Sequence, residues 1–147
     1  MRLHDIDFDA VFSSPRRRAL QTAELAGFAS TIQTELLAEV DYGEYEGLTT
    51  AQIRNRRPDW ELWRDGCPAG ESPLQVAERA RRVLARLQGD GQANVLVFSH
   101  GHFLRALATQ FLGLQVESAA RLSLDTASLS ILRTGDRGHL LQLWNLT

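Results

Sequence analysis

Short apolar runs alternate along this chain with longer segments of helical periodicity. Residues 8–14 (FDAVFSS) and 94–99 (NVLVFS) are typical of strands. The second run is apolar throughout, as expected for a strand buried on both faces of a parallel sheet. The segment 72–89 predicts a helix that Ser72 caps and Gly89 ends. Its apolar face consists of Val76, Ala80, Val83, Leu84 and Leu87.

The other segments continue the alternation of strands and helices. We expect a helix opened by Pro15 and ended by Gly27, and a second, apolar helix over 102–113. Residues 31–40 predict a strand followed by a loop, 41–49 an exposed loop, 49–73 short helices and turns, and 127–133 with 139–145 a β-hairpin. The order predicts a three-layer α/β fold with a mostly parallel sheet and a C-terminal antiparallel hairpin. The absence of a linker or repeat predicts one domain over 1–147.

Composition narrows the range of partners. The formal net charge is −2, so no bulk electrostatic argument favours nucleic acid or a membrane surface. The single cysteine, Cys67, excludes an intramolecular disulfide and favours a cytoplasmic location, and no apolar run approaches the ~20 residues of a membrane span. All sixteen Lys+Arg residues are arginine. Arginine is therefore the permanently charged group available for binding anions, and its fork suits phosphate.

Two polar clusters follow predicted strands, at residues 13–18 and 100–105. The carboxyl ends of parallel strands meet at one sheet edge, where ligands bind. We expect Gly101 to allow a tight turn and the next helix to present free N–H groups, with Arg105 one turn in. The pattern predicts an anion site made by Arg18, His100 and the N–H groups of residues 101–103. The alternative is a capped helix with a solvated arginine.

Other chemistry is open to the same residues. His100 and His102 form an H-x-H pair of the kind that binds zinc, but no further ligand stands at a suitable spacing, so we expect no metal. Glu39, Glu44 and Glu46 are candidates for a general acid. A solvated acidic loop explains Glu44 and Glu46 better than Glu39.

Four segments in order resemble the histidine phosphatase (phosphoglycerate mutase-like) superfamily. They are VFSSPRRRALQTAEL, LLAEVDYGEYEG, GES at 70–72 and VFSHGHFLR. The resemblance implies that Arg18 binds the transferred phosphoryl group, that Glu39 gives a proton to the leaving oxygen, and that His100 holds the phosphoryl oxygens. It also implies substrate binding by Ser14, Gly101 and His102, without a cofactor. The expected substrate is a small phosphate ester.

The S-H-G-H sequence and the segment before it look most like a branch that acts on sugar phosphates and bisphosphates, including sedoheptulose-bisphosphatase-like enzymes. The family's R-H-G motif, whose histidine is the nucleophile, does not occur in this chain. We therefore expect a family member that lacks its first strand and helix, an N-terminally truncated domain with impaired or no activity. The alternative is a non-catalytic protein that binds phosphorylated ligands. A phosphoglycerate mutase ranks lower, because the 60 residues between Glu39 and His100 lack the long insertion usual in mutases.

A missing first strand also has a structural consequence. Strand 94–99 would keep strand 8–14 on one edge and lose its neighbour on the other. An unpaired apolar edge invites pairing with another segment. We expect either that the hairpin docks directly on 94–99 or that the chain forms a homo-oligomer through this edge.

Overall fold

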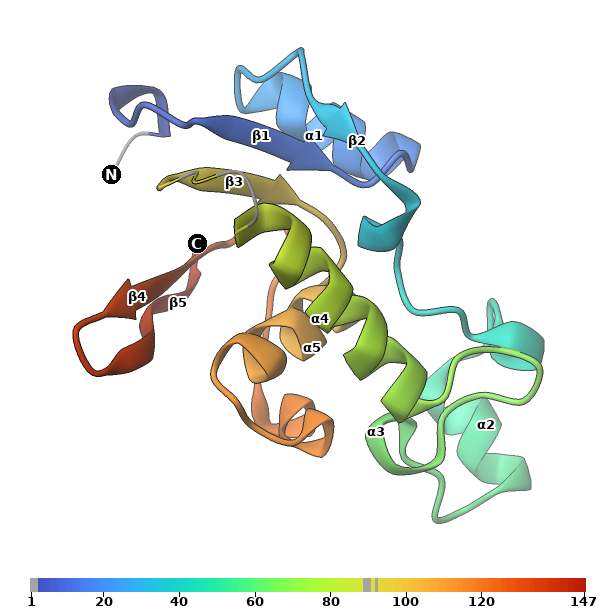
Figure 1. Cartoon of the computed structure of the whole chain (residues 1–147). Helices are drawn as coiled ribbons and strands as arrows, with labels where there is room; N and C mark the ends of the chain where they lie inside the picture. Colours follow the sequence, from blue (N-terminus) through green and yellow to red (C-terminus); the bar gives the residue numbers. More distant parts are fainter. Residues whose placement is uncertain (1–2, 89–90, 92) are drawn as a thin grey trace.

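Three parallel strands form the main sheet in the order β2–β1–β3 (Figure 1). The computed structural model describes residues 3–88, 91 and 93–147. The strands are β1 (Ala10–Ser13), β2 (Ile32–Gln33) and β3 (Val95–Phe98). β1 is central and pairs with β3 along its whole length, from Ala10 opposite Val95 to Ser13 opposite Phe98. The strands predicted within 8–14 and 94–99 are therefore confirmed.

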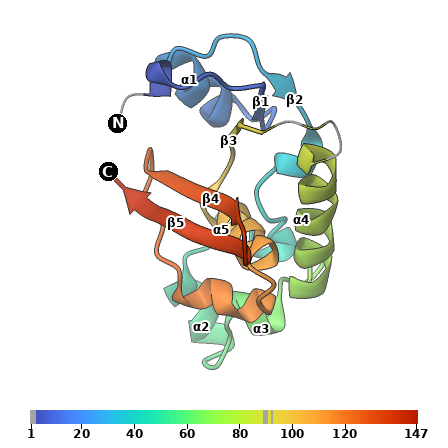
Figure 2. The same cartoon turned by 60° about the vertical axis from the view of Figure 1, so that its left-hand side comes forward.

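Helices cover both faces of this sheet, which confirms the three-layer α/β arrangement (Figures 1 and 2). Phe12 and Val97 pack toward α4 (Pro73–Gln88) and α5 (Gly101–Phe111). Leu96 and Phe98 belong to a second cluster, on the side of α1 (Arg17–Leu25). The alternation shows why residues 94–99 are apolar throughout, since side chains on both faces of β3 pack against other elements.

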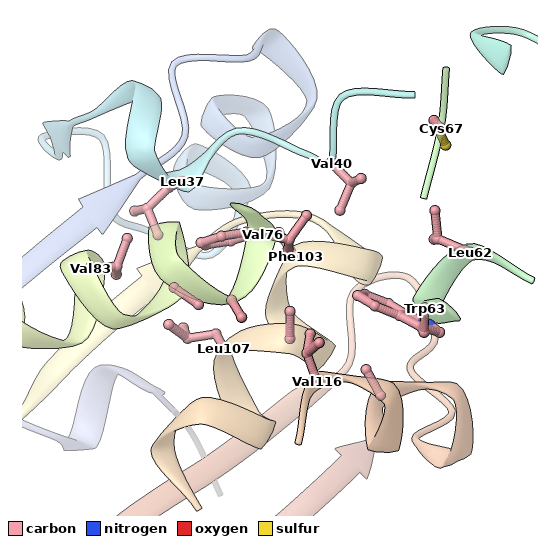
Figure 3. Packing of buried hydrophobic residues seen from close by; sticks show 14 of the residues in the cluster. Leu37, Val40, Leu62, Trp63, Cys67, Val76, Val83, Phe103, Leu107 and Val116 are labelled. Carbon is pink, nitrogen blue, oxygen red and sulfur yellow. The ribbon is translucent and has the colours of Figure 1, made fainter. Parts of the chain in front are cut away.

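The larger core lies between α4, α5 and the short helices that precede α4 (Figure 3). Phe103 and Leu37 are fully buried there, and Trp60 and Trp63 also pack into it rather than lining the surface. The short helices predicted within 49–73 are present as α2 (Thr50–Arg56) and α3 (Leu62–Asp65). The segments predicted as loops before them contain 3₁₀ turns, η2 (Glu35–Leu37) and η3 (Gly43–Tyr45), and η1 (Leu3–Asp5) and η4 (Val116–Arg121) lie elsewhere. Among the described helices, none is long and apolar enough to cross a membrane.

Several element ends differ from the prediction. The predicted strand in 31–40 has only two residues before the chain turns into η2. α1 begins after Arg16 and has no side-chain cap. The Ser14 hydroxyl lies two residues before Arg16, where it accepts from the Arg16 amide at 3.3 Å and lies 2.8 Å from Nε2 of His100. α4 begins at Pro73 as predicted, with Ser72 accepting a hydrogen bond from the Gln75 amide. Its predicted end at Gly89 lies outside the described residues.

The C-terminal hairpin is confirmed as β4 (Leu129–Gly135) paired with β5 (Gly138–Leu146). It forms a sheet of its own, and within the described residues it is not hydrogen-bonded to β3. A cavity of about 580 Å³ separates the two sheets, and its apolar lining includes Val97, Ile131 and Trp144. Direct docking of the hairpin on β3 is therefore wrong for the described residues, and self-association through this edge stays a prediction.

Two glycines let two loops approach each other beside the candidate site. The Glu71 amide donates to the Asp41 carbonyl at 2.9 Å. A Cβ on Gly70 would lie 2.4 Å from that same carbonyl oxygen, and one on Gly43 would lie 2.2 Å from the Pro68 carbonyl oxygen. Backbone atoms cannot move aside as a flexible side chain can, so only glycine fits these positions.

We expect Gly70→Ala to lower the free energy of unfolding by about 1–3 kcal/mol, the usual cost of overpacking. Gly101→Ala is the matched control, because a Cβ at Gly101 meets no atom within 4 Å. Urea denaturation of the two variants measures the difference. Equal midpoints for Gly70→Ala and the unsubstituted chain would contradict the steric account.

Candidate active site

The carboxyl ends of β1 and β3 bring the two predicted polar clusters together. Ser14 follows β1 directly, and its amide donates to the Phe98 carbonyl at 2.9 Å. His100 follows β3 and is 5% exposed. Its Nε2 lies 2.8 Å from the Ser14 hydroxyl oxygen. Parallel pairing therefore places two residues that are far apart in sequence in direct contact.

Arg18 adds a cation to this contact from the first turn of α1. Its Nε–H donates to Nδ1 of His100 at 2.9 Å. An imidazole nitrogen that accepts a hydrogen bond carries no proton, so the remaining proton is on Nε2, which donates to Ser14. Burial lowers the pKa of His100, and the charge of Arg18 lowers it further. The imidazole is thus held neutral beside a guanidinium.

Glu39 lies in the segment after η2 and reaches the N-terminus of α5. One carboxylate oxygen accepts from the Phe103 amide at 2.9 Å and from its neighbour Val40 at 2.9 Å, and the other accepts from the His102 amide at 3.3 Å. The amides at the start of a helix have no intrahelical partner and attract negative charge. These contacts explain why Glu39, rather than another acidic residue, takes this position.

The same contacts correct the predicted anion site. Two of the three amides expected to bind an anion, those of His102 and Phe103, donate their hydrogen bonds to Glu39. Within the described part of the chain, the Gly101 amide has no acceptor, and the space a Cβ would fill is open. Of the three amides predicted for the anion site, that of Gly101, the first residue of α5, is therefore the one left available within the described residues.

His102, expected to bind substrate, contacts aromatic side chains. Its Nδ1 lies 2.5 Å from the Tyr42 hydroxyl, and its ring lies 5.8 Å from that of Trp63. Burial raises the pKa of Tyr42, as does the charge of Glu39, so the phenol keeps its proton. His102 lines a cavity of about 320 Å³. Tyr42 lines this cavity and also a second, larger one beside Arg18 and Glu39.

A cavity of about 620 Å³ opens beside Arg18 and Glu39. One part of its lining is cationic, with Arg16, Arg18 and Arg79. The other part is acidic, with Glu35, Glu39, Asp41, Glu46 and Glu71. Ser14 and His100 do not line the cavity; they are buried, and the hydrogen bond from Arg18 to His100 connects them to it.

Arg79 and Glu71 are the site residues that sequence reasoning missed as functional. They form an ion pair of 2.7 Å, and Arg79 also binds the backbone of the segment that carries Glu39. A signal was present, because Arg79 stands three residues after Val76 and four before Val83, on the apolar face of α4. A charged residue on a buried helical face needs partners.

Arg105, expected near the anion site, turns away from it. Its Nε and Nη2 both donate to the Ala119 carbonyl, at 2.9 and 2.6 Å, and its guanidinium lies over the Trp63 ring. Arg105 thus fixes η4 against α5. Among the described residues, no group of three or more His, Cys, Asp or Glu side chains is placed to hold a metal ion.

The fold and the paired strand ends define an α/β protein with a polar site at the carboxyl edge of its parallel sheet. Sequence comparison then identifies the family. The sequence pattern of the histidine phosphatase superfamily (branch 1) matches residues 1–147. The chain belongs to this family.

Two of the relatives carry the names of phosphatases. The chain is 49% identical over 128 residues to an acid phosphatase of Mycobacterium tuberculosis, covering 86% of this chain and 63% of that protein. It is 35% identical over 132 residues to sedoheptulose 1,7-bisphosphatase of Saccharomyces cerevisiae, covering 73% of this chain and 49% of that protein. The chain thus spans half to two thirds of the length of these two curated relatives.

Solved structures agree with the assignment. The structure of the M. tuberculosis open reading frame Rv3214 has a TM-score of 0.89 and 45% identity, covering 99% of this chain and 77% of that one. A mycobacterial glucosyl-3-phosphoglycerate phosphatase solved with inorganic phosphate has a TM-score of 0.84 and 30% identity, covering 99% and 81%. These similarities confirm the phosphoglycerate mutase-like fold predicted from the motifs.

The neutral state of His100 predicts that anion binding depends on pH. A lowered pKa means that the free site holds a neutral imidazole, and a bound anion favours the protonated form. Sulfate affinity should therefore rise as the pH falls below the usual imidazole value of about 6.5, by up to about tenfold per pH unit. Sulfate keeps its charge over this range, so the slope belongs to the protein.

Calorimetric titration with sulfate at several pH values measures this slope, and His100→Gln is the variant that should abolish it. A pH-independent affinity in the unsubstituted chain, or an unchanged slope in His100→Gln, would show that His100 does not take up the proton.

Proposed function

We propose that this chain binds the phosphoryl group of small phosphate esters at Arg18 and His100 and acts as a phosphomonoester hydrolase of the histidine phosphatase type. The single observation that carries the proposal is the hydrogen-bonded set Arg18–His100–Ser14 at the paired ends of β1 and β3. Glu39, on the wall of the same cavity, is the proposed proton donor to the leaving oxygen.

The chemistry of phosphoryl transfer suits these residues. The transferred group spreads negative charge over its oxygens, and positioned cationic and N–H donors stabilise that charge. Arg18 can exchange its bond with His100 for bonds to a phosphate, since the guanidinium lines the cavity. The released Nδ1 of His100 can then be protonated and add a second donor. The Gly101 amide, which has no acceptor within the described residues, can supply a third.

The absence of an R-H-G motif limits the activity that we propose. Neutral His100 is engaged on both ring nitrogens, by Arg18 and by Ser14, and does not replace the family's nucleophile. We therefore propose that hydrolysis by this chain is weak and that phosphoryl binding is the property it retains. The alternative, a non-catalytic protein that binds phosphorylated ligands, is favoured by this same engagement of His100.

The lining of the cavity supports sugar phosphates or bisphosphates as the ligand class. Carboxylates accept hydrogen bonds from hydroxyl groups, and arginines bind phosphate, so the two-sided lining fits a polyhydroxylated phosphate ester. The yeast sedoheptulose 1,7-bisphosphatase and the mycobacterial glucosyl-3-phosphoglycerate phosphatase are consistent with this class. A phosphoglycerate mutase ranks lower, although a Methylorubrum extorquens mutase is 34% identical over 136 residues.

Arg18→Ala should weaken the binding of inorganic phosphate by about 10- to 100-fold, the worth of a charge-assisted hydrogen bond. Arg17→Ala is the matched control, because Arg17 is an exposed neighbour in the same helical turn and does not line the cavity. Calorimetry on both variants tests the assignment. Equal phosphate affinity in the two variants would remove Arg18 from the site.

Glu39→Gln should lower the hydrolysis of a chromogenic phosphate ester by about 10²- to 10⁴-fold, the usual contribution of a general acid. A loss of about tenfold or less would move the role to another carboxylate. Of the two other candidates from the sequence, Glu44 does not line the cavity, whereas Glu46 does. Glu46→Gln is therefore the comparison variant.

A further inference from the structure

The ion pair between Arg79 and Glu71 is the least exposed of those in the described residues, with side chains 14% and 19% exposed. The guanidinium and the carboxylate form a bidentate pair. Nε of Arg79 donates to one oxygen of Glu71 and Nη2 to the other, each at 2.7 Å. Such bidentate pairs fix orientation as well as distance.

The remaining donors of Arg79 bind the backbone around Glu39. Nη1 donates to the carbonyls of Leu36 and Ala38, at 2.9 and 2.8 Å. Nη2 also donates to the Glu39 carbonyl, at 3.3 Å. A guanidinium has five N–H donors, and these contacts use all five. Three of the five acceptors are carbonyls in the four residues that end at Glu39.

Glu71 secures the chain on the other side of Glu39. One of its carboxylate oxygens accepts from the Asp41 amide at 2.9 Å, and its own amide donates to the Asp41 carbonyl at 2.9 Å. One ion pair therefore holds the backbone immediately before Glu39 and two residues after it.

The same guanidinium also contacts the residue that receives the Glu39 side chain. Arg79 lies 4.2 Å above the centre of the Phe103 ring. The Phe103 amide donates to the Glu39 carboxylate at 2.9 Å. Arg79 thus contacts both residues that form this hydrogen bond, through the backbone carbonyl of Glu39 and the ring of Phe103.

Stability alone does not account for this arrangement. A buried ion pair adds little net stability, because the desolvation of two charges offsets their attraction. Apolar residues of similar size often stabilise the folded state equally well. Apolar residues could not hold three carbonyls and a facing amide in one geometry.

We propose that Arg79, held by Glu71, is a positioning residue that fixes the Glu39 carboxylate against the N-terminus of α5. The proposal rests on the role proposed above for Glu39, since the value of this position is delivery of a proton to the leaving group. A displacement of about 1 Å in such a group can cost about 10²-fold in rate.

Arg79→Lys tests the proposal, because lysine keeps the charge but cannot form the fork. The readout is hydrogen exchange of the His102 and Phe103 amides, which have Glu39 as their acceptor and none within the helix. We expect both amides to exchange about tenfold faster, the equivalent of one lost hydrogen bond, while the amides of 106–108 stay unchanged. Arg82→Lys, an exposed change on the same helix, should alter none of them.

A double-mutant cycle with Glu39→Ala completes the test. Arg79→Lys should have no further effect on these two amides once the carboxylate is gone, and on its own it should lower kcat with KM unchanged. Unchanged exchange at His102 and Phe103, or equal acceleration throughout α5, would overturn the proposal. A failure of the proposed function appears separately, as the absence of phosphate binding that depends on Arg18.

Discussion

The parallel pairing of β1 with β3 is the constraint on which the site depends. Each strand has only four residues, and the register places Ser13 opposite Phe98. A slip of one residue would reverse the faces of every side chain and separate Ser14 from His100. The apolar side chains on both faces of β3 keep this register, because each face packs against a different layer of helices. Core packing and site geometry are thus set by the same residues.

A second constraint comes from how the chain distributes opposite charges in a small space. Glu39 occupies the amides at the start of α5, so the carboxylate and the Arg18–His100 pair do not neutralise each other by direct contact. Arg79 is fully used by Glu71 and by backbone carbonyls, whereas Arg18 can exchange its hydrogen bond to His100 for one to a ligand. The site therefore combines a carboxylate held in a fixed position, that of Glu39, with a guanidinium, that of Arg18, which a ligand can draw away from His100.

Sequence reasoning identified the layers, the two polar clusters and the candidates Arg18, Glu39 and His100, because strand ends and helix starts have local signals. It could not find where side chains point. Arg105 follows the same motif as His100 yet faces the Ala119 carbonyl, since its place on α5 turns it toward η4. The contact of Glu39 with two α5 amides joins residues more than 60 positions apart. No local pattern encodes such a contact. The five hydrogen bonds of Arg79 could not be predicted for the same reason.

The central claim is that a phosphoryl group binds where Arg18 meets His100. Nitrogen NMR of the His100 ring during titration with inorganic phosphate tests it most directly. The account predicts that the Nδ1 resonance moves as Arg18 leaves the imidazole, together with the Gly101 amide, and that both changes saturate at one phosphate concentration. Resonances of His100 and Gly101 that stay fixed while phosphate shifts residues elsewhere would contradict the account.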